Sequence, residues 1–322
     1  MLHMPIKENL RMAIYYAPRG RFRLFILGSE LSQKYLYPTD LLIGIIGAEG
    51  SGKSTLIKGL FPGLELTNDD EGINKRTSDI FDFNPSDFFS GHTFHLDIRY
   101  ELAFHQMHEI VDAIKKVLAA NKRVVVEHFD LIYHQIGFNA QIIFGIGEEV
   151  RVYRPSIFGP SPLRIQQVAE ENLKYRLMAH SAEDIVGKIL KDVHNFVPNQ
   201  LHSDVRHGFI IGFDEKPTID LAELEQQVLA FMAQDLPVTA GTGDFVLFDK
   251  EPFYCTGKRI HVKRTSQIEK FRLMKDYKFD PHSGKYLMVG IVGEEPIEIF
   301  DELPPVRVGL VNYEMQQDKD FR

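Results

Sequence analysis

Apolar and polar positions follow two periodicities along the chain, and together they predict an α/β protein. Residues 41–47 (LLIGIIG) are a continuous apolar run, typical of a strand buried on both faces, which implies a central parallel sheet. Residues 105–121 carry apolar side chains at helical spacing, and residues 122–130 (KRVVVEHFD) follow as a β-branched run that ends in an acid. A helix that leads into a strand is the unit of a doubly wound sheet, so we expect helices to flank the sheet.

The same patterns predict the remaining elements and a division of the chain into three parts. Around a turn at residues 18–20, the segment 12–27 predicts two short strands, and 31–37 predicts a short helix. Further strands are expected at 141–145, 149–154 and 207–213, and further helices at 164–180 and 220–233. After Asp235 the chain is rich in strand formers and turn residues. The expected parts are a β-rich extension (1–40), an α/β domain (41–235) and a smaller β-rich domain (236–322).

Composition narrows the class of protein. With 44% hydrophobic and 25% charged residues in 322, the chain is typical of a folded globular protein. The single cysteine, Cys255, excludes an intramolecular disulfide and favours a reducing compartment. No run approaches the roughly 18 apolar residues that span a bilayer, and the first 20 residues lack the pattern of a signal peptide. We therefore expect a cytoplasmic protein without a membrane segment. The net charge of -8 argues against non-specific coating of nucleic acid.

The strongest motif lies at residues 47–54, GAEGSGKS, which matches G-x-x-x-x-G-K-[ST] in full. Glycines allow a tight turn whose N–H groups point into one concavity, and the following helix adds its positive end, so the segment favours a phosphate chain. Lys53 is expected to reach the β- and γ-phosphates and Ser54 to ligate Mg2+. The predicted strand before the motif and helix after it supply the required context. The residues expected to hold the nucleotide are Gly47, Glu49, Gly50, Ser51, Gly52, Lys53, Ser54 and Thr55.

These residues resemble the phosphate-binding segment of the large P-loop family of nucleoside triphosphate-binding proteins. The resemblance implies a P-loop-type parallel sheet flanked by helices, with a second acid at the end of a neighbouring strand for Mg2+, and Glu127 is the candidate. Residues 64–72 (LELTNDDEG) look like the second strand of P-loop kinases. Asp69 or Asp70 would then accept the proton of the phosphoryl acceptor, unless Asn-Asp-Asp is simply a turn.

Nucleotide kinases of this family also use arginines from a mobile lid. Arg154, Arg164 and Arg176 lie in the corresponding region, but their spacing matches no lid signature. They are equally compatible with ordinary surface residues.

The C-terminal segment 255–279 carries a second resemblance. Cys255, His261, TSQI at 265–268 and FRL at 271–273 resemble the second additional domain of alanyl-tRNA synthetases and their free-standing editing relatives. In that family the Cys and His bind zinc together with two upstream histidines spaced H-x-x-x-H on a helix, where mischarged aminoacyl-tRNA is hydrolysed. The resemblance therefore implies a zinc site.

This chain departs from the family pattern in two places. Five residues separate Cys255 from His261 instead of three, and the nearest upstream pair, His202 and His207, has a spacing that does not place both rings on one helical face. Loop geometry still permits a zinc site made of His202, His207, Cys255 and His261. The alternative is that Cys255 is a small buried hydrophobic residue and that the histidines are ordinary hydrogen-bonded or surface residues.

Charge separates the C-terminal segment from the rest of the chain. Residues 250–290 hold ten Lys/Arg and four Asp/Glu, a local balance of +6, with aromatic residues interleaved. Such a segment could face tRNA or another polyanion. It could equally be a solvated sheet face that pairs with the acidic remainder.

The sequence therefore predicts Mg2+-dependent binding of ATP or GTP with hydrolysis or phosphoryl transfer, in which Lys53 and Asp69 or Asp70 are catalytic. The alternative hypothesis is an RNA-associated module that resembles a zinc-dependent aminoacyl-tRNA hydrolase and is regulated by nucleotide binding.

Overall fold

The apolar run at 41–47 forms the central strand of a sheet. This strand, β2 (Leu42–Gly47), is buried along its whole length. Its side chains alternate between two apolar clusters, Ile43 and Ile45 on one face and Leu42 and Ile46 on the other. The predicted strand between two layers of helices is thus confirmed. The computed structural model describes residues 10–18, 20–67, 78–86, 91–196, 202–205 (backbone alone), 207–255, 257 and 260–294.

Within the described residues, this sheet has six strands and is mixed rather than wholly parallel. Its order is β1-β6-β5-β2-β4-β3, and β5, β2, β4 and β3 are parallel. The edge strands β6 and β1 are antiparallel, because two residues separate β5 from β6 and so short a connection reverses the chain. The strands flanking β2 are β1 (Met12–Tyr16), β3 (Thr93–Asp97), β4 (Arg123–Glu127), β5 (Ile142–Ile146) and β6 (Glu149–Tyr153).

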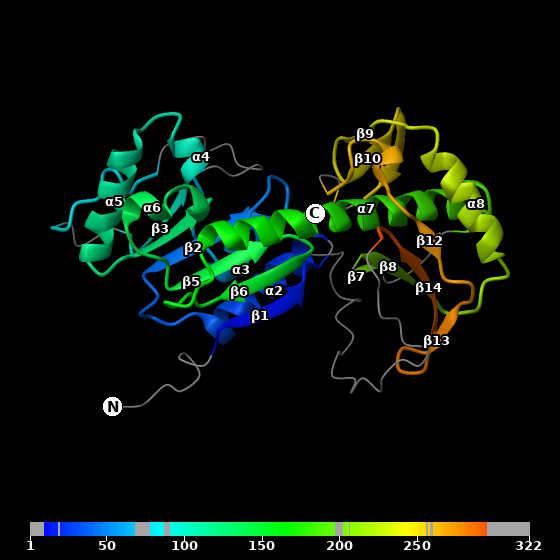
Figure 1. Cartoon of the computed structure of the whole chain (residues 1–322), viewed down its shortest axis with the longest axis horizontal. Helices are drawn as coiled ribbons and strands as arrows, with labels where there is room; N and C mark the ends of the chain where they lie inside the picture. The colour runs from blue at the N-terminus through cyan, green and yellow to red at the C-terminus, as the bar shows by residue number, and fades with distance from the viewer. Residues whose placement is uncertain are drawn as a thin grey trace.

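Helices cover both faces of this sheet, as expected for an α/β protein (Figure 1). Two pack against the face of Ile43 and Ile45, and the others pack against the opposite face. The first two are α2 (Arg21–Tyr35) and α3 (Lys53–Leu60). The others are α4 (Ile98–Glu101), α5 (Met107–Ala119), the 3-10 turn η1 (Phe129–Leu131), α6 (Tyr133–Ile136) and the first part of α7 (Pro162–Asp192).

The second strand predicted within 12–27 is wrong, because those residues begin α2. Leu24, Gly28 and Leu31 are its buried residues, and their spacing is helical. A Cβ added to Gly28 would lie 2.6 Å from the Leu56 carbonyl oxygen, and one added to Gly59 would overlap the Phe25 backbone. The two helices therefore approach through their glycines, a contact that an alternating hydrophobic pattern does not reveal.

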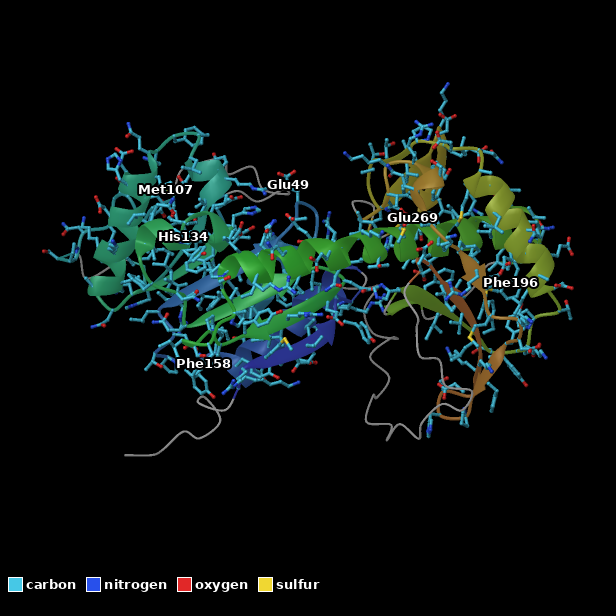
Figure 2. The ribbon with its side chains drawn as sticks, in the orientation of Figure 1. Glu49, Met107, His134, Phe158, Phe196 and Glu269 are labelled. Carbon is cyan, nitrogen blue, oxygen red and sulfur yellow. The ribbon has the colours of Figure 1, made fainter. Side chains whose placement is uncertain are left out.

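Helix α7 is longer than predicted and joins two parts of the molecule. It begins where the Ser161 hydroxyl accepts a hydrogen bond from the Arg164 amide, and it ends at Asp192 instead of His180. Its first turns pack beside the six-stranded sheet, and its later turns lie among the elements that follow α7 in the chain (Figure 1). There Lys174 pairs with Glu269, which Figure 2 labels beside the helix (3.2 Å).

We call the elements up to β6, with the first half of α7, the N-terminal unit. The second half of α7 and everything after it form the C-terminal unit. Among the described residues, its larger sheet runs β12-β14-β8-β7 with β13 beside β14, and a small sheet runs β11-β10-β9. Its elements are β7 (His202–Val205), β8 (Gly208–Phe213), α8 (Leu221–Met232), β9 (Val238–Ala240), β10 (Phe245–Phe248), β11 (Glu251–Tyr254), η2 (Thr265–Gln267), β12 (Arg272–Leu273), β13 (Lys278–Asp280) and β14 (Lys285–Ile291).

The packing bears on the expected division of the chain. One apolar cluster runs from Met178 to Val292 and includes β8 and α8. The predicted boundary near 236 lies inside this cluster, so the hydrophobic contacts divide the chain within α7. Likewise, β1 and α2 of the expected extension (1–40) belong to the six-stranded sheet and its helical layer. None of the helices in the described residues has the length and apolar character needed to cross a bilayer.

Candidate nucleotide and metal sites

The 47–54 motif connects the end of β2 to the start of α3. Gly50 and Gly52 have φ values of 75° and 99°, which side chains other than glycine rarely adopt. A Cβ on Gly47 would lie 2.7 Å from the Ile146 carbonyl oxygen, and one on Gly52 would clash with Leu24. The strand, loop and helix order expected for the motif is therefore present, and the glycines are sterically required. The first N–H groups of a helix are not used by hydrogen bonds within that helix, so those at the start of α3 are suited to bind an anion beside the loop.

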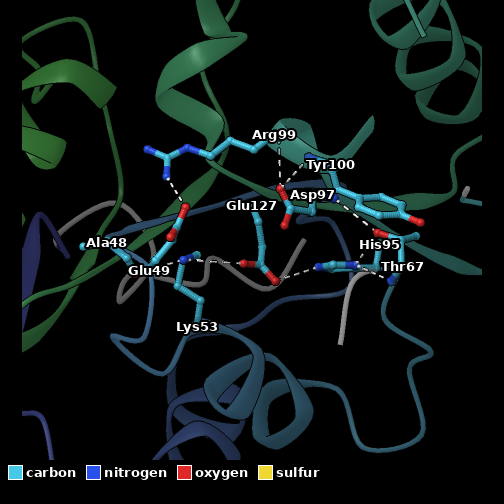
Figure 3. A network of polar contacts seen from close by, with 9 residues as sticks. All are labelled: Ala48, Glu49, Lys53, Thr67, His95, Asp97, Arg99, Tyr100 and Glu127. Carbon is cyan, nitrogen blue, oxygen red and sulfur yellow. Dashed lines mark hydrogen bonds and ion pairs between the residues drawn. The ribbon is translucent and has the colours of Figure 1, made fainter. Parts of the chain in front are cut away.

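Lys53 begins α3 and reaches back over the loop (Figure 3). Its Nζ donates to the Ala48 carbonyl oxygen at 3.0 Å and lies 3.9 Å from Oε2 of Glu127. Both side chains are almost fully buried. Because β2 and β4 are parallel neighbours, the end of β4 brings Glu127 to the edge of the sheet where the loop lies. An ammonium group and a carboxylate thus meet beside the candidate phosphate position.

His95 holds the other oxygen of Glu127. The Thr67 backbone amide donates to Nδ1 of His95 at 3.2 Å, so Nδ1 is the acceptor and the proton resides on Nε2. Nε2 then donates to Oε1 of Glu127 at 3.1 Å. All three residues are buried, and this chain of hydrogen bonds fixes the orientation of the carboxylate (Figure 3).

A second acid lies beside Glu127 at the end of β3. Asp97 pairs in register with Glu127, and its Oδ1 caps α4 by accepting from the Arg99 and Tyr100 amides (Figure 3). Donor atoms of Asp97, Glu127 and His128 all lie within 4.8 Å of one another, a spacing compatible with a metal ion. Burial, helped by the charges of Lys53 and Arg99, lowers the pKa of His128 to about 4, so this imidazole is neutral at pH 7.

Sequence reasoning missed Asp97. Residues 64–67, expected to begin the second strand of a kinase, have no strand structure, and the strand beside β4 is β3. Asp69 and Asp70 lie outside the described residues. The overlooked signal is TFHLD at 93–97, an apolar stretch ending in an acid, which was obscured because His95 and Thr93 break its apolar run.

The remaining predicted loop residues lie as follows. Ser54 and Thr55 are half-buried in the first turn of α3, next to Lys53. Ser51 is buried, and its hydroxyl oxygen has no hydrogen-bond partner among the described residues. The exposed Glu49 accepts a hydrogen bond from Arg99 at 3.2 Å across the loop (Figure 3). Such an exposed pair contributes little to stability.

The three arginines considered for a lid have different surroundings. Arg154 is buried and makes two hydrogen bonds to the Asp40 carboxylate, 2.9 and 2.7 Å, at the opposite ends of the strands. Arg164 is exposed on α7. Arg176 is buried against the 47–54 loop, where its Nη1 donates to the Ser51 carbonyl oxygen at 3.1 Å.

The C-terminal unit contains a second group of potential metal ligands. It consists of His180 and Asp184 from α7 with Cys255 and His261, and we call it the His-Asp-Cys-His group. The His180 Nε2 lies 3.2 Å from the Cys255 sulfur, and the His261 Nε2 lies 2.8 Å from the Asp184 carboxylate. One donor atom from each residue lies within 4.8 Å of the others. His261 Nδ1 is buried without a hydrogen-bond partner in the described part of the chain.

The structure corrects the predicted zinc ligands. Cys255 and His261 do come together, but His207 contacts the Glu148 carboxylate and the Tyr175 ring in a different place. His202 lies in β7, where its backbone pairs with Ile211 of β8, and the position of the His202 side chain is not described. The helical pair is His180 and Asp184, four residues apart on one face of α7. The prediction missed it because the helix was expected to end at His180.

The positive charge of residues 250–290 is partly neutralised by neighbouring acids. Arg264 pairs with Asp235 at 2.7 Å, Lys270 with Glu294 at 3.4 Å and Lys285 with Asp214 at 3.8 Å. All three acids lie outside residues 250–290. Three of the ten basic residues of this segment thus have an acidic partner from elsewhere in the described chain.

Comparisons with protein families and with curated proteins give no match to this chain.

Proposed function

We propose that the chain binds ATP or GTP with Mg2+ at the 47–54 loop and transfers the terminal phosphoryl group to water or to a second substrate. The observation that carries this proposal is the position of Lys53, which begins α3 directly after the loop and lies between Ala48 and Glu127. Backbone N–H groups of the loop would bind phosphate oxygens, and Lys53 would exchange its contact with the Ala48 carbonyl for the β- and γ-phosphates. A P-loop-type fold is part of this proposal.

The residues around Lys53 fit a magnesium ion. Ser54 offers a hydroxyl oxygen and Glu127 a carboxylate, which are the oxygen ligands that Mg2+ prefers. When bound, Mg2+ would neutralise charge that develops on the transferred phosphoryl group. His95 keeps Glu127 oriented by donating from Nε2 to Oε1.

Asp97 is the acceptor-side acid that the described residues offer in this proposal. It lies beside Glu127 at the sheet edge, and its carboxylate could accept the proton of an attacking hydroxyl group or water. Asp69 and Asp70 stay candidates for the same role, since they lie outside the described residues.

Titration calorimetry tests the nucleotide proposal. We expect wild-type protein to bind MgATP or MgGTP and Lys53→Ala to lose at least about a hundredfold in affinity, because a buried charge contact to phosphate disappears. Lys115→Ala, on the exposed face of α5, is the matched control and should bind as wild type does. Unchanged affinity in Lys53→Ala would contradict the proposal.

The second candidate is a zinc-binding C-terminal unit that acts on aminoacyl-tRNA or contacts another polyanion, and the His-Asp-Cys-His group favours it. Imidazole, thiolate and carboxylate are all zinc ligands, and the two anionic groups would neutralise a buried Zn2+. Four protein ligands are typical of structural zinc sites, whereas hydrolytic sites keep one position open. The group therefore supports zinc binding more directly than it supports hydrolysis.

Metal analysis tests the second candidate independently of the first. Stoichiometric zinc in the wild type that disappears in Cys255→Ala would support the second candidate, with Met274→Ala, a half-buried residue outside the group, as control. Zinc-free wild-type protein that fails to take up added Zn2+ would exclude it. Hydrolysis of mischarged aminoacyl-tRNA by the wild type, lost in Cys255→Ala, would extend it to catalysis.

A further inference from the structure

Arg176 is a buried cation that joins the loop to the helix shared by both units. It is 1% exposed, and its Nη1 donates to the carbonyl oxygens of Ser51 and Gly147, each at 3.1 Å. A Cβ on Gly147 would overlap the backbone of Ala169, so α7 lies directly against the turn between β5 and β6. Arginine stays protonated in proteins, so a full positive charge is held behind the loop.

The hydrogen bond from Arg176 to Ser51 fixes the orientation of one peptide group of the loop. By accepting from Arg176, the Ser51 carbonyl oxygen is held against α7. The Ser51 amide donates to the Ala48 carbonyl oxygen within the loop. The guanidinium also adds positive potential at the position expected for phosphates, in surroundings where charges are poorly screened. Arg176 is thus placed to position the loop although it belongs to a helix that is remote in sequence.

The same helix carries two of the four residues of the His-Asp-Cys-His group. His180 follows Arg176 by four residues, one turn or about 6 Å along the axis, and Asp184 follows by another turn. All three side chains are buried and lie on one face of α7. A displacement of α7 that adjusts the metal ligands therefore also displaces the group that holds the loop.

A second contact reinforces this connection. The backbone amide of His207, at the start of β8, donates to the Glu148 carboxylate, and the Ala17 amide donates to the Glu148 carbonyl. Glu148 directly follows Gly147, the second acceptor of Arg176. The β5–β6 turn is therefore held by α7 through Arg176 and by the C-terminal unit through His207.

We propose that Arg176 is a positioning residue of the nucleotide loop and that it couples nucleotide binding at the loop to metal binding at the His-Asp-Cys-His group. Metal binding exchanges the His261–Asp184 contact for bonds to the ion and sets the axial position of α7. Arg176 transmits that position to Ser51 and Gly147. This inference rests on the proposed nucleotide and zinc sites. By linkage, each ligand must change the affinity for the other by the same factor.

The test is a binding cycle on the full chain. Affinity for a non-hydrolysable MgATP analogue is measured on zinc-loaded protein and on protein stripped with a zinc-selective chelator, and zinc affinity is measured with and without the analogue. We expect both affinities to change by one common factor of about five or more. Arg176→Gln should reduce that factor to about one while both ligands still bind. Arg176→Lys, which keeps the charge but loses the planar fork, should retain part of it.

Arg164→Gln, on the exposed early part of the same helix, is the matched control and should keep the full factor. Independent binding of the two ligands by the wild type overturns this inference alone, as does a full factor in Arg176→Gln. Absence of MgATP-analogue binding by the wild type overturns it together with the nucleotide proposal, and absence of zinc binding overturns it together with the second candidate. If Arg176→Gln does not fold, the common factor in the wild type and its reduction in Arg176→Lys still test the coupling.

Discussion

The two candidate sites differ in how the chain builds them. The nucleotide site is made from residues 47–54, one contiguous loop between β2 and α3, completed by acids at the ends of neighbouring strands. The His-Asp-Cys-His group combines one face of α7 with a distant loop: His180 and Cys255 are 75 positions apart in the sequence. The loop of the first site takes its shape mainly from its own glycines, whereas the second site exists only when the C-terminal unit has packed.

This difference predicts different responses to perturbation. A substitution in the loop or at its acids should change nucleotide affinity or turnover while the fold persists, because the surrounding strands are buried on both sides. A substitution in the His-Asp-Cys-His group should change metal affinity and the stability of the C-terminal unit together, because metal binding and packing share the same residues.

The largest effect is expected for Asp97→Asn. The amide retains an oxygen that can cap α4, so the fold and nucleotide affinity should be kept, but it is a poor proton acceptor. We expect the turnover of ATP or GTP to fall by about a hundredfold or more. Steady-state phosphate release, with calorimetry for nucleotide affinity, measures the two quantities separately. Turnover equal to that of the wild type would remove Asp97 from the acceptor side and return the role to Asp69 or Asp70.

On the other side of the comparison, Asp184→Asn should weaken zinc binding. A neutral amide is a poorer zinc ligand than a carboxylate and leaves the buried ion with uncompensated charge, so affinity should fall by about 10–100-fold. Competition with a chromophoric chelator measures this change. Asp192→Asn, at the exposed end of the same helix, serves as control because it is not part of the group. Equal affinities for the two variants would exclude Asp184 as a ligand.

Packing behind the loop gives a smaller effect. Gly59→Ala should lower the free energy of unfolding by about 1–3 kcal/mol, because the new methyl group has to displace α2 from α3. In the C-terminal unit, a Cβ on Gly212 meets side-chain atoms no closer than 3.4 Å, so Gly212→Ala should change stability little. Chemical denaturation compares the two variants. Equal stability losses would indicate that the helix contact is less tight than the structure shows.

The smallest expected effect concerns pH. Burial holds the pKa of folded His128 near 4, below its ordinary value of 6.5, so the folded state disfavours the charged ring. The neutral ring therefore contributes to the stability of the fold; this contribution is complete above pH 6.5 and is lost as the pH falls towards 4. From pH 8 to pH 5, wild type should lose on the order of 1–2 kcal/mol more than His128→Asn, and asparagine tolerates the left-handed backbone of this position. Parallel losses in both proteins would exclude His128 as the titrating group.

The sequence predicts the parts of this fold that depend on local periodicity. The strands at β2, β4, β5, β6 and β8 and the helices α5 and α8 were expected from patterns that lie within each element. The loop site was expected from the contiguous motif at residues 47–54. Only the end of helix α2 was expected, within the predicted helix 31–37; its first turns were predicted as a strand, and its close approach to α3 through Gly28 and Gly59 leaves no periodic apolar signal.

The rest of the candidate sites depends on tertiary contacts. Asp97 could be placed only once β3 was known to lie beside β4. His180 and Asp184 have the four-residue spacing of a helical ligand pair, but thirteen histidines offer many chance pairs, and the correct one follows from the packing of Cys255 and His261 against α7. The contact of Arg176 with Ser51 carries no sequence signal because it joins residues 125 positions apart.

Hydrogen–deuterium exchange with the two ligands added separately tests the central claim most directly. We predict that MgATP gives its strongest protection at the amides of residues 47–56, and that Zn2+ gives its strongest protection around Cys255, His261 and the second half of α7. Lys53→Ala should lose the first protection and keep the second. Absence of MgATP protection at residues 47–56 in the wild type, or strongest protection elsewhere, would contradict the assignment of this loop as the nucleotide site.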